Sequence, residues 1–133
     1  MDRVLSLTCA AVVASSLAQA ARAADAAHGK ELFSAKCTVC HNADRDAGNK
    51  IGPNLFGVVR PSGSIIGFSY SSAMKGAGVV WTPDKLAAYL AGPQKMIPGI
   101  RMTFPGFSNP ADAQDVVSYL STLKQQPART AAE

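Results

Sequence analysis

Five consecutive residues, Cys37-Thr38-Val39-Cys40-His41, combine two thiols and an imidazole in the C-x-x-C-H pattern. Two thiols three positions apart at the end of a helix can reach the two vinyl groups of one porphyrin, and the pattern is typical of covalent haem attachment. The imidazole of the adjacent His41 can then turn onto the iron. We therefore predict one covalently attached haem c, with its iron bound by His41.

The same residues have two other uses, as a disulfide or thiol-exchange site and as half of a zinc site. A thiol-exchange motif usually lies between a strand and a helix, and this sequence shows no such context. A zinc site would need a second Cys or His pair, which is missing. Haem attachment is the favoured interpretation.

A haem iron held by one histidine has a sixth position. The candidates for it are Met74, Met96, Met102 and His28. Met102 is the best of them, because Pro and Gly residues on both sides favour a fixed loop that could present the thioether inward. Methionine more often fills a core, however, so spacing alone leaves the sixth ligand open.

Residues 1–23 have the pattern of a secretory signal peptide: a short charged start, an apolar stretch and two small-x-small sites. The apolar stretch is shorter than the roughly 20 residues that a membrane-spanning helix needs, so an uncleaved anchor is the poorer interpretation. Cleavage after Ala20 or Ala23 removes Cys9 and leaves two cysteines. We expect a periplasmic protein, with a domain over residues 24–124 and a flexible tail over residues 125–133.

Composition agrees with one small soluble domain. The chain has 133 residues, of which 47% are hydrophobic and 17% are charged, and these values exclude a disordered or collagen-like protein. The net charge of +4 favours an acidic partner surface. The basic residues are scattered rather than clustered, so we expect no nucleic-acid partner.

Three helices are predicted from their start signals. Asp25 can cap a helix over residues 26–36 that delivers Cys37, and Thr82-Pro83-Asp84 starts a second helix that Gly92-Pro93 stops. A third begins at Asn109-Pro110 and carries apolar residues at helical spacing up to Leu123. No strand pattern appears, so we expect an all-α domain.

The stretch from Asn42 to Gly67 is too rich in Gly, Pro, Asn and Asp for long regular elements, so it is predicted to be ordered loop. Three short helices with long loops bury little apolar area in a domain of this size. Something large and apolar should therefore fill the centre.

From Gly29 to about Lys124 the chain resembles the class I c-type cytochromes, the mitochondrial type and its soluble bacterial periplasmic relatives. The motifs occur in the same order: Gly29 and Phe33, Cys37-x-x-Cys40-His41, Gly52-Pro53-Asn54-Leu55, Gly67-Phe68-Ser69-Tyr70, Trp81, Tyr89-Leu90, Pro98-Gly99-x-x-Met102-x-Phe104 and Tyr119-Leu120. The resemblance implies the cytochrome c fold, with three main helices, short helices and long loops wrapped around one covalently bound haem.

The resemblance also implies roles for single residues. Met102 matches the distal iron ligand, and the Pro53 carbonyl matches the acceptor of the second ring proton of His41, which would fix the imidazole's orientation. Tyr70 and Trp81 match residues that hold a haem propionate, and Tyr89 matches one whose hydroxyl lies near the ligand sulfur. Gly29 and Tyr119 match the close crossing of the first and last helices.

Two positions depart from the family pattern. Met74 stands where the mitochondrial type often has Asn, and Ile100 where it often has Thr. A drier pocket raises the reduction potential, whereas the lost donors affect the propionates in the opposite direction. The net sign does not follow from the sequence.

His and Met ligation leaves no open site for a substrate, so the expected function is a soluble electron carrier and not an enzyme. The rivals are a dedicated acceptor for one dehydrogenase, an open-haem enzyme or gas sensor, and a thiol oxidoreductase. Expected partners are redox proteins: a quinol-oxidising cytochrome complex, a terminal oxidase, a reaction centre or a dehydrogenase. We expect a monomer that docks transiently at the membrane surface, and the resemblance places Lys36, Lys95 and Arg101 around the haem edge.

Overall fold

The computed structural model describes residues 22–59 and 63–123. The predicted tail over residues 125–133 and all but the last two residues of the predicted signal peptide lie outside the described residues. Five helices follow one another: α1 (Ala26–Lys36), α2 (Ser72–Gly76), α3 (Pro83–Ala91), α4 (Pro93–Met96) and α5 (Pro110–Leu123). The described residues form no strand, so the predicted all-α class is confirmed.

The three long helices begin where the sequence predicts them. The Asp25 carboxylate caps α1 by accepting hydrogen bonds from the backbone N–H groups of Ala27 and His28. The Thr82 hydroxyl caps α3 by accepting from Lys85, and Gly92 follows its last residue. In each case a side-chain oxygen satisfies N–H groups that have no partner inside the helix.

The short helices lie where no helix was placed. The Ser71 hydroxyl accepts from the Met74 N–H and starts α2. Pro93, which was predicted only to stop the preceding helix, also begins the single turn of α4, because proline suits the first position of a helix. None of the described helices is long and apolar enough to cross a membrane.

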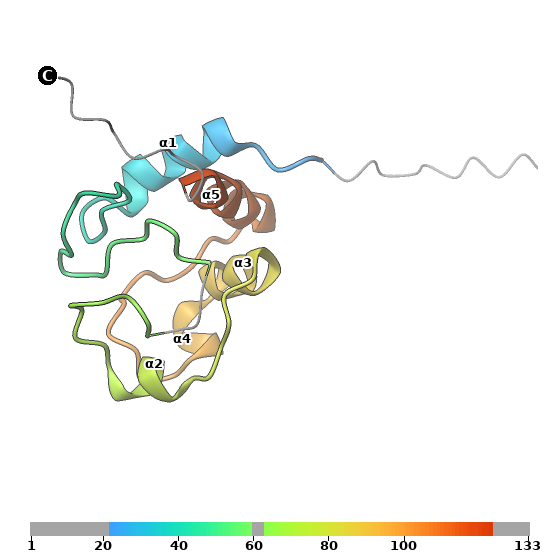
Figure 1. The fold of residues 1–133 in the computed structure, drawn as a ribbon. Coiled ribbons are helices and arrows are strands. Elements are labelled where there is room, and N and C mark those ends of the chain that lie inside the picture. Colours follow the sequence, from blue (N-terminus) through green and yellow to red (C-terminus); the bar gives the residue numbers. More distant parts are fainter. Residues whose placement is uncertain (1–21, 60–62, 124–133) are drawn as a thin grey trace, which may run out of the picture.

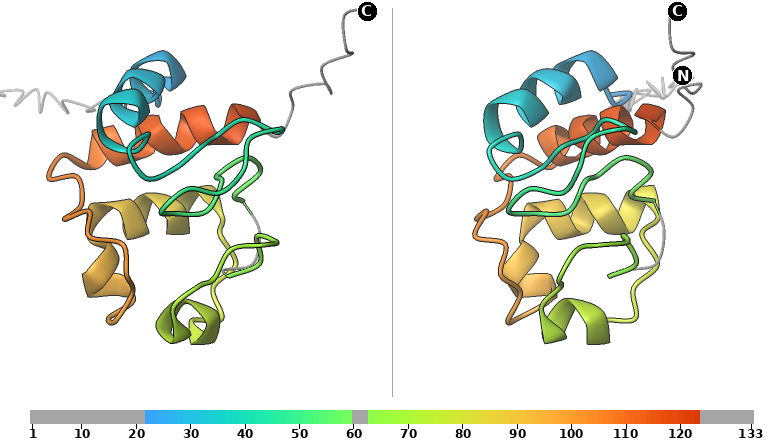
Figure 2. Two further views of the ribbon diagram at one scale, coloured as in Figure 1. Left: turned by 90° about the vertical axis from the view of Figure 1, so that its left-hand side faces the viewer. Right: turned by 60° about the vertical axis from the view of Figure 1, so that its left-hand side comes forward.

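Figures 1 and 2 show α1 and α5 crossing at one end of the molecule, α3 beneath α5, and α2 and α4 at the opposite end. The crossing of α1 and α5 is close: a Cβ built on Gly29 would lie 1.9 Å from the backbone oxygen of Asp115. Only glycine fits there. Beside it, the rings of Phe33 and Tyr119 pack with their centroids 5.5 Å apart.

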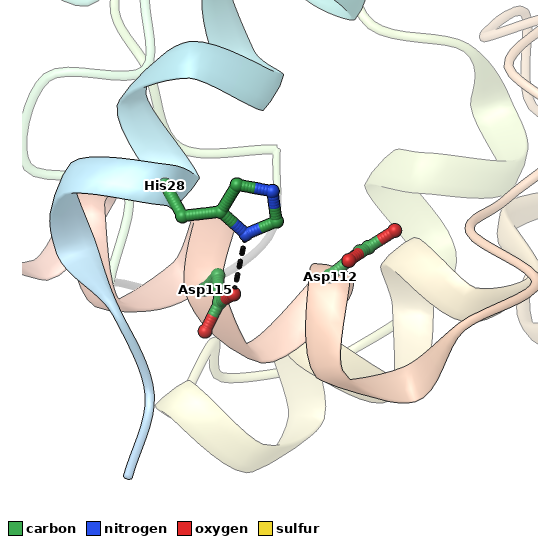
Figure 3. Close-up of side chains that lie close together, drawn as sticks. All are labelled: His28, Asp112 and Asp115. Atoms are coloured by element: carbon green, nitrogen blue, oxygen red, sulfur yellow. Dashed lines mark hydrogen bonds and ion pairs between the residues drawn. The ribbon is translucent and has the colours of Figure 1, made fainter. Parts of the chain in front are cut away.

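An ion-pair cluster around the buried Asp115 joins the same two helices (Figure 3). The Asp115 side chain is fully buried, and its Oδ1 accepts from the Asp25 N–H at 2.7 Å and from Arg22 Nη1 at 3.3 Å. Its Oδ2 accepts from His28 Nδ1 at 2.7 Å and from Arg22 Nη2 at 3.0 Å. Cleavage after Ala23 would remove Arg22 from this cluster, whereas cleavage after Ala20 would keep it.

Candidate functional site

A cavity of about 660 Å³ opens between the helices and the long loops. Its walls come from the end of α1, the loop after it, α2, α3, the loop after α4, and α5. All eight predicted site residues line it: Cys37, Cys40, His41, Pro53, Tyr70, Trp81, Tyr89 and Met102. Residues distant in the sequence therefore meet at one place, and its size suits a large prosthetic group.

The two thiols stand on a turn that continues directly from α1. The Cys37 N–H donates to the Phe33 carbonyl at 2.8 Å, and the His41 N–H donates to the Cys37 carbonyl at 2.9 Å. Both cysteines are free. Burial, supplemented by the neighbouring Cys40, raises the pKa of Cys37 to about 11.

This raised pKa bears on the thiol-exchange alternative. A cysteine that attacks disulfides needs a lowered pKa, because the thiolate is the nucleophile. Cys37 has the opposite environment, so it is poorly suited to that chemistry. A buried thiol facing an apolar cavity instead fits attachment to a group held in the cavity.

The imidazole of His41 is held in one orientation. Its Nδ1 lies 2.8 Å from the Pro53 carbonyl oxygen, which can only accept, so Nδ1 carries the proton and Nε2 keeps its lone pair. Burial lowers the pKa of His41 more than the Pro53 hydrogen bond raises it. Neutral imidazole with a free Nε2 is the form that binds iron.

Gly52 packs against the other side of this imidazole. A Cβ built on Gly52 would lie 2.3 Å from His41 Cε1. The Gly52 N–H donates to the Cys40 carbonyl at 2.7 Å, which ties the loop back to the thiol turn. The glycine and Pro53 together form a slot that the ring fills.

Met102 and Tyr89 meet elsewhere in the cavity wall. The Tyr89 hydroxyl donates to Met102 Sδ at 3.4 Å, and the Tyr89 ring packs on Trp81 with centroids 4.8 Å apart. Burial raises the pKa of Tyr89 to about 12, so the hydroxyl keeps its proton. The tyrosine can therefore orient the thioether at any moderate pH.

The other candidates for the sixth position separate into two groups. His28 is paired with Asp115, and Met96 is 38% exposed; neither is among the residues that line the cavity. Met74 does line it. Position therefore leaves Met102 and Met74, and only the sulfur of Met102 has an oriented hydrogen-bond donor among the described contacts.

Tyr70 and Trp81, which the resemblance associates with a haem propionate, both line the cavity. Trp81 is buried, and the Tyr70 hydroxyl accepts from the Ile65 N–H at 3.3 Å. The two apolar departures, Met74 and Ile100, also line the cavity. The propionate roles stay predictions, and so does the effect of the two departures on the haem pocket.

Sequence reasoning missed Gln94, whose side chain reaches the loop that carries Met102. It also gave Gly52 no role beyond its place in a motif. Neither follows from spacing, because a contact across a loop leaves no periodic pattern. The cavity also has apolar walls, formed by Val58, Leu86, Val116 and Leu120. In the sequence these residues look like ordinary core positions, so nothing marks them as part of a binding site.

His28, Asp112 and Asp115 also lie close enough together to suggest a cation site (Figure 3). Each oxygen of Asp115 already accepts two hydrogen bonds, and His28 Nδ1 is directed at one of them. A metal ion would have to displace these donors. The cluster is therefore a structural ion-pair network.

The cavity fits a haem on its chemistry as well as on its size. It is mostly apolar, it presents two thiols beside one another, and it holds a neutral imidazole with its free nitrogen available. A haem bound there would complete the core that the three helices and the loops enclose.

Comparison with known proteins agrees with this site. The family model described as Cytochrome c matches residues 26–124. The chain is 46% identical over 101 residues to cytochrome c2 of Rhodopila globiformis, and the aligned region covers 75% of this chain and 94% of the relative. It is 45% identical over 101 residues to cytochrome c of Guizotia abyssinica, covering 75% of this chain and 91% of the relative.

Cytochromes c carry covalently attached haem c and transfer electrons to and from redox proteins; they are not enzymes. The match covers the thiol turn, the Pro53 loop, the Met102 loop and both crossing helices. The chain belongs to the cytochrome c family and is a monohaem electron carrier.

Proposed function

We propose that the chain is exported to the periplasm and carries single electrons between membrane-associated redox proteins, with His41 and Met102 as the two iron ligands. The observation that carries the proposal is the convergence of an oriented imidazole and an oriented thioether on one cavity. The haem supplies an iron that changes its charge by one electron.

The protein's own residues keep the structural rearrangement that accompanies this charge change small. Pro53 holds the His41 ring through Nδ1, and Gly52 leaves the ring no room to turn. On the distal side, Tyr89 holds the Met102 sulfur. Fixed ligands and an apolar wall mean little reorganisation when the charge changes, as a carrier requires.

The rim of the cavity supports docking to acidic partners. Val39 and Ile51 line the cavity yet are 73% and 78% exposed. The exposed cations Lys36 and Arg101 line the same cavity, and Lys95 lies on α4 near the Met102 loop. An apolar centre with cations around it suits brief association steered by charge.

The test is an absorption spectrum of the exported protein, oxidised and reduced, before and after extraction with acidified organic solvent. We expect haem that resists extraction and, in the ferric protein, the charge-transfer band of a methionine–iron bond. A five-coordinate spectrum at neutral pH would overturn the ligand assignment. Extractable haem would overturn the attachment through Cys37 and Cys40.

Location and partners need separate measurements. The N-terminal sequence of the exported protein distinguishes cleavage after Ala20 from cleavage after Ala23, and an uncleaved N-terminus would contradict export by this route. Electron transfer to a quinol-oxidising complex, terminal oxidase, reaction centre or dehydrogenase should slow as salt rises, because screening acts over about 8 Å at physiological ionic strength. A rate indifferent to salt would contradict steering by the rim cations.

A further inference from the structure

The Gln94 side chain spans from α4 to the Met102 loop. Its Nε2 lies 2.8 Å from the Ile100 carbonyl oxygen and 3.0 Å from the Met102 carbonyl oxygen. An amide nitrogen carries two hydrogens, so one can go to each carbonyl. A single side chain thus holds the backbone on both sides of Arg101.

Few other hydrogen bonds hold the backbone of this part of the loop, although the Ile100 side chain is buried in the core and Phe104 packs against it. Within the described part of the chain, residues 98–106 make no backbone–backbone hydrogen bond outside the helices. The Arg101 guanidinium donates to the Ser69 carbonyl, and the Tyr89 hydroxyl donates to the Met102 sulfur. Among the described residues, the Ile100 and Met102 carbonyls therefore accept their hydrogen bonds from the Gln94 amide.

The direction of these carbonyls matters because they belong to residues whose side chains face the cavity. Ile100 is buried, and both Ile100 and Met102 line the cavity wall. The hydrogen bonds from Gln94 hold these two carbonyls against α4. They therefore limit the backbone rotation that would move the Met102 sulfur out of the cavity.

We propose that Gln94 is a positioning residue that latches the Met102 loop closed and so controls how readily the iron's sixth position opens. The inference rests on the proposed function, because it takes Met102 as the distal ligand. Gln94 touches neither the sulfur nor the cavity; it acts through the backbone of the loop.

Imidazole binding to the ferric holoprotein measures this opening. Imidazole can bind the iron only after Met102 leaves, so its apparent affinity rises with the fraction of molecules in which the loop is open. Binding is followed by the loss of the methionine–iron charge-transfer band. Gln94→Ala removes both donors, and we expect about tenfold tighter apparent binding, equivalent to about 1.4 kcal/mol.

Gln94→Glu provides a second variant of the same length. Its carboxylate has no donor and faces two carbonyl oxygens, so binding should tighten at least as much as in Gln94→Ala. Gln114→Ala is the matched control, because Gln114 is an exposed glutamine on α5. It should bind imidazole as the unaltered protein does. All variants should keep the charge-transfer band in the absence of imidazole.

The outcomes separate the two proposals. If the unaltered ferric protein lacks the band, Met102 ligation is wrong and the proposed function fails. If the band is present but both Gln94 variants bind imidazole within twofold of Gln114→Ala, the latch is overturned. A lower melting temperature with unchanged imidazole affinity also overturns it, because Gln94 would then act only on general stability.

Discussion

The contact between Gly52 and His41 makes the proximal side of the site sensitive to one methyl group. In Gly52→Ala the new Cβ would lie 2.3 Å from Cε1, 2.7 Å from Nδ1 and 2.8 Å from Nε2 of His41. Ordinary van der Waals contact begins near 3.4 Å, so the ring must move by about 1 Å. That movement competes directly with the 2.8 Å hydrogen bond from Nδ1 to Pro53.

Two costs combine in this variant. Overpacking a filled site costs about 1–3 kcal/mol, and weakening one hydrogen bond costs about 1 kcal/mol. The free energy of unfolding should fall by about 3 kcal/mol, which lowers the melting temperature by roughly 10–20 °C in a domain of this size. A weaker Nδ1–H···O bond also makes His41 a poorer donor to ferric iron. The reduction potential should rise by about 40 mV for each 1 kcal/mol of ferric stabilisation that is lost.

The assays are thermal unfolding followed by circular dichroism and a potentiometric titration of the haem band. Gly48→Ala is the matched control: Gly48 lies in the same loop, and a Cβ built on it meets nothing within 4 Å. It should change neither quantity appreciably. If Gly52→Ala melts and titrates as Gly48→Ala does, the ring is free to move and the slot described for His41 is wrong.

Three further predictions follow from named contacts. Met102→Ala should abolish the methionine–iron charge-transfer band, lower the reduction potential and let carbon monoxide bind the iron, whereas Met74→Ala should keep the band. A band that remained in Met102→Ala would show that Met102 is not the iron ligand. Replacing both Cys37 and Cys40 by Ser should leave haem extractable and the exported chain largely without helix by circular dichroism, and native helix content would show that the core does not need attached haem. Burial raises the pKa of Asp115, but hydrogen bonds from Asp25, His28 and Arg22 outweigh it and lower the pKa to about 2. Stability from this carboxylate is therefore present at neutral pH and lost as pH falls from about 4 to 2. In protein that retains Arg22, as after cleavage at Ala20, Asp115→Asn should cost about 2 kcal/mol at pH 7 and flatten that acid limb in denaturant titrations; an unchanged limb would contradict the role of the cluster.

The long helices were predictable because their start signals are local. Asp25 and Thr82 each accept hydrogen bonds from N–H groups two or three residues ahead, so the sequence around the cap contains the whole interaction. The thiol turn was predictable for the same reason, since the three side chains that carry its chemistry are nearly consecutive. Here local residues determine local structure, and tertiary packing does not override them.

The parts that escaped prediction depend on contacts between distant segments. The resemblance implied short helices without placing them, because α2 and α4 are too short to produce a periodic pattern in the sequence. The reach of Gln94 to two carbonyls and the fit of Gly52 against His41 depend on how loops fold over the cavity. Spacing made Met102 only the best of several candidates, and the roles predicted for Pro53 and Tyr89 came from the resemblance to class I cytochromes alone.

The chain holds the proximal side of the site more firmly than the distal side. On the proximal side, His41 is part of the thiol turn, Gly52 is hydrogen-bonded back to Cys40, and Pro53 lies next in the chain, so the proposed ligand and its support share one short segment. On the distal side, Met102 comes from a loop that is held by side-chain hydrogen bonds from Gln94, Tyr89 and Arg101 and by the packing of Ile100 and Phe104 against the core. Such bonds contribute about 1 kcal/mol each. The distal loop should therefore open more readily than the proximal side. For this reason we expect substitutions at Gln94 to change ligand exchange at the iron, and substitutions at Gly52 to change the reduction potential and the stability.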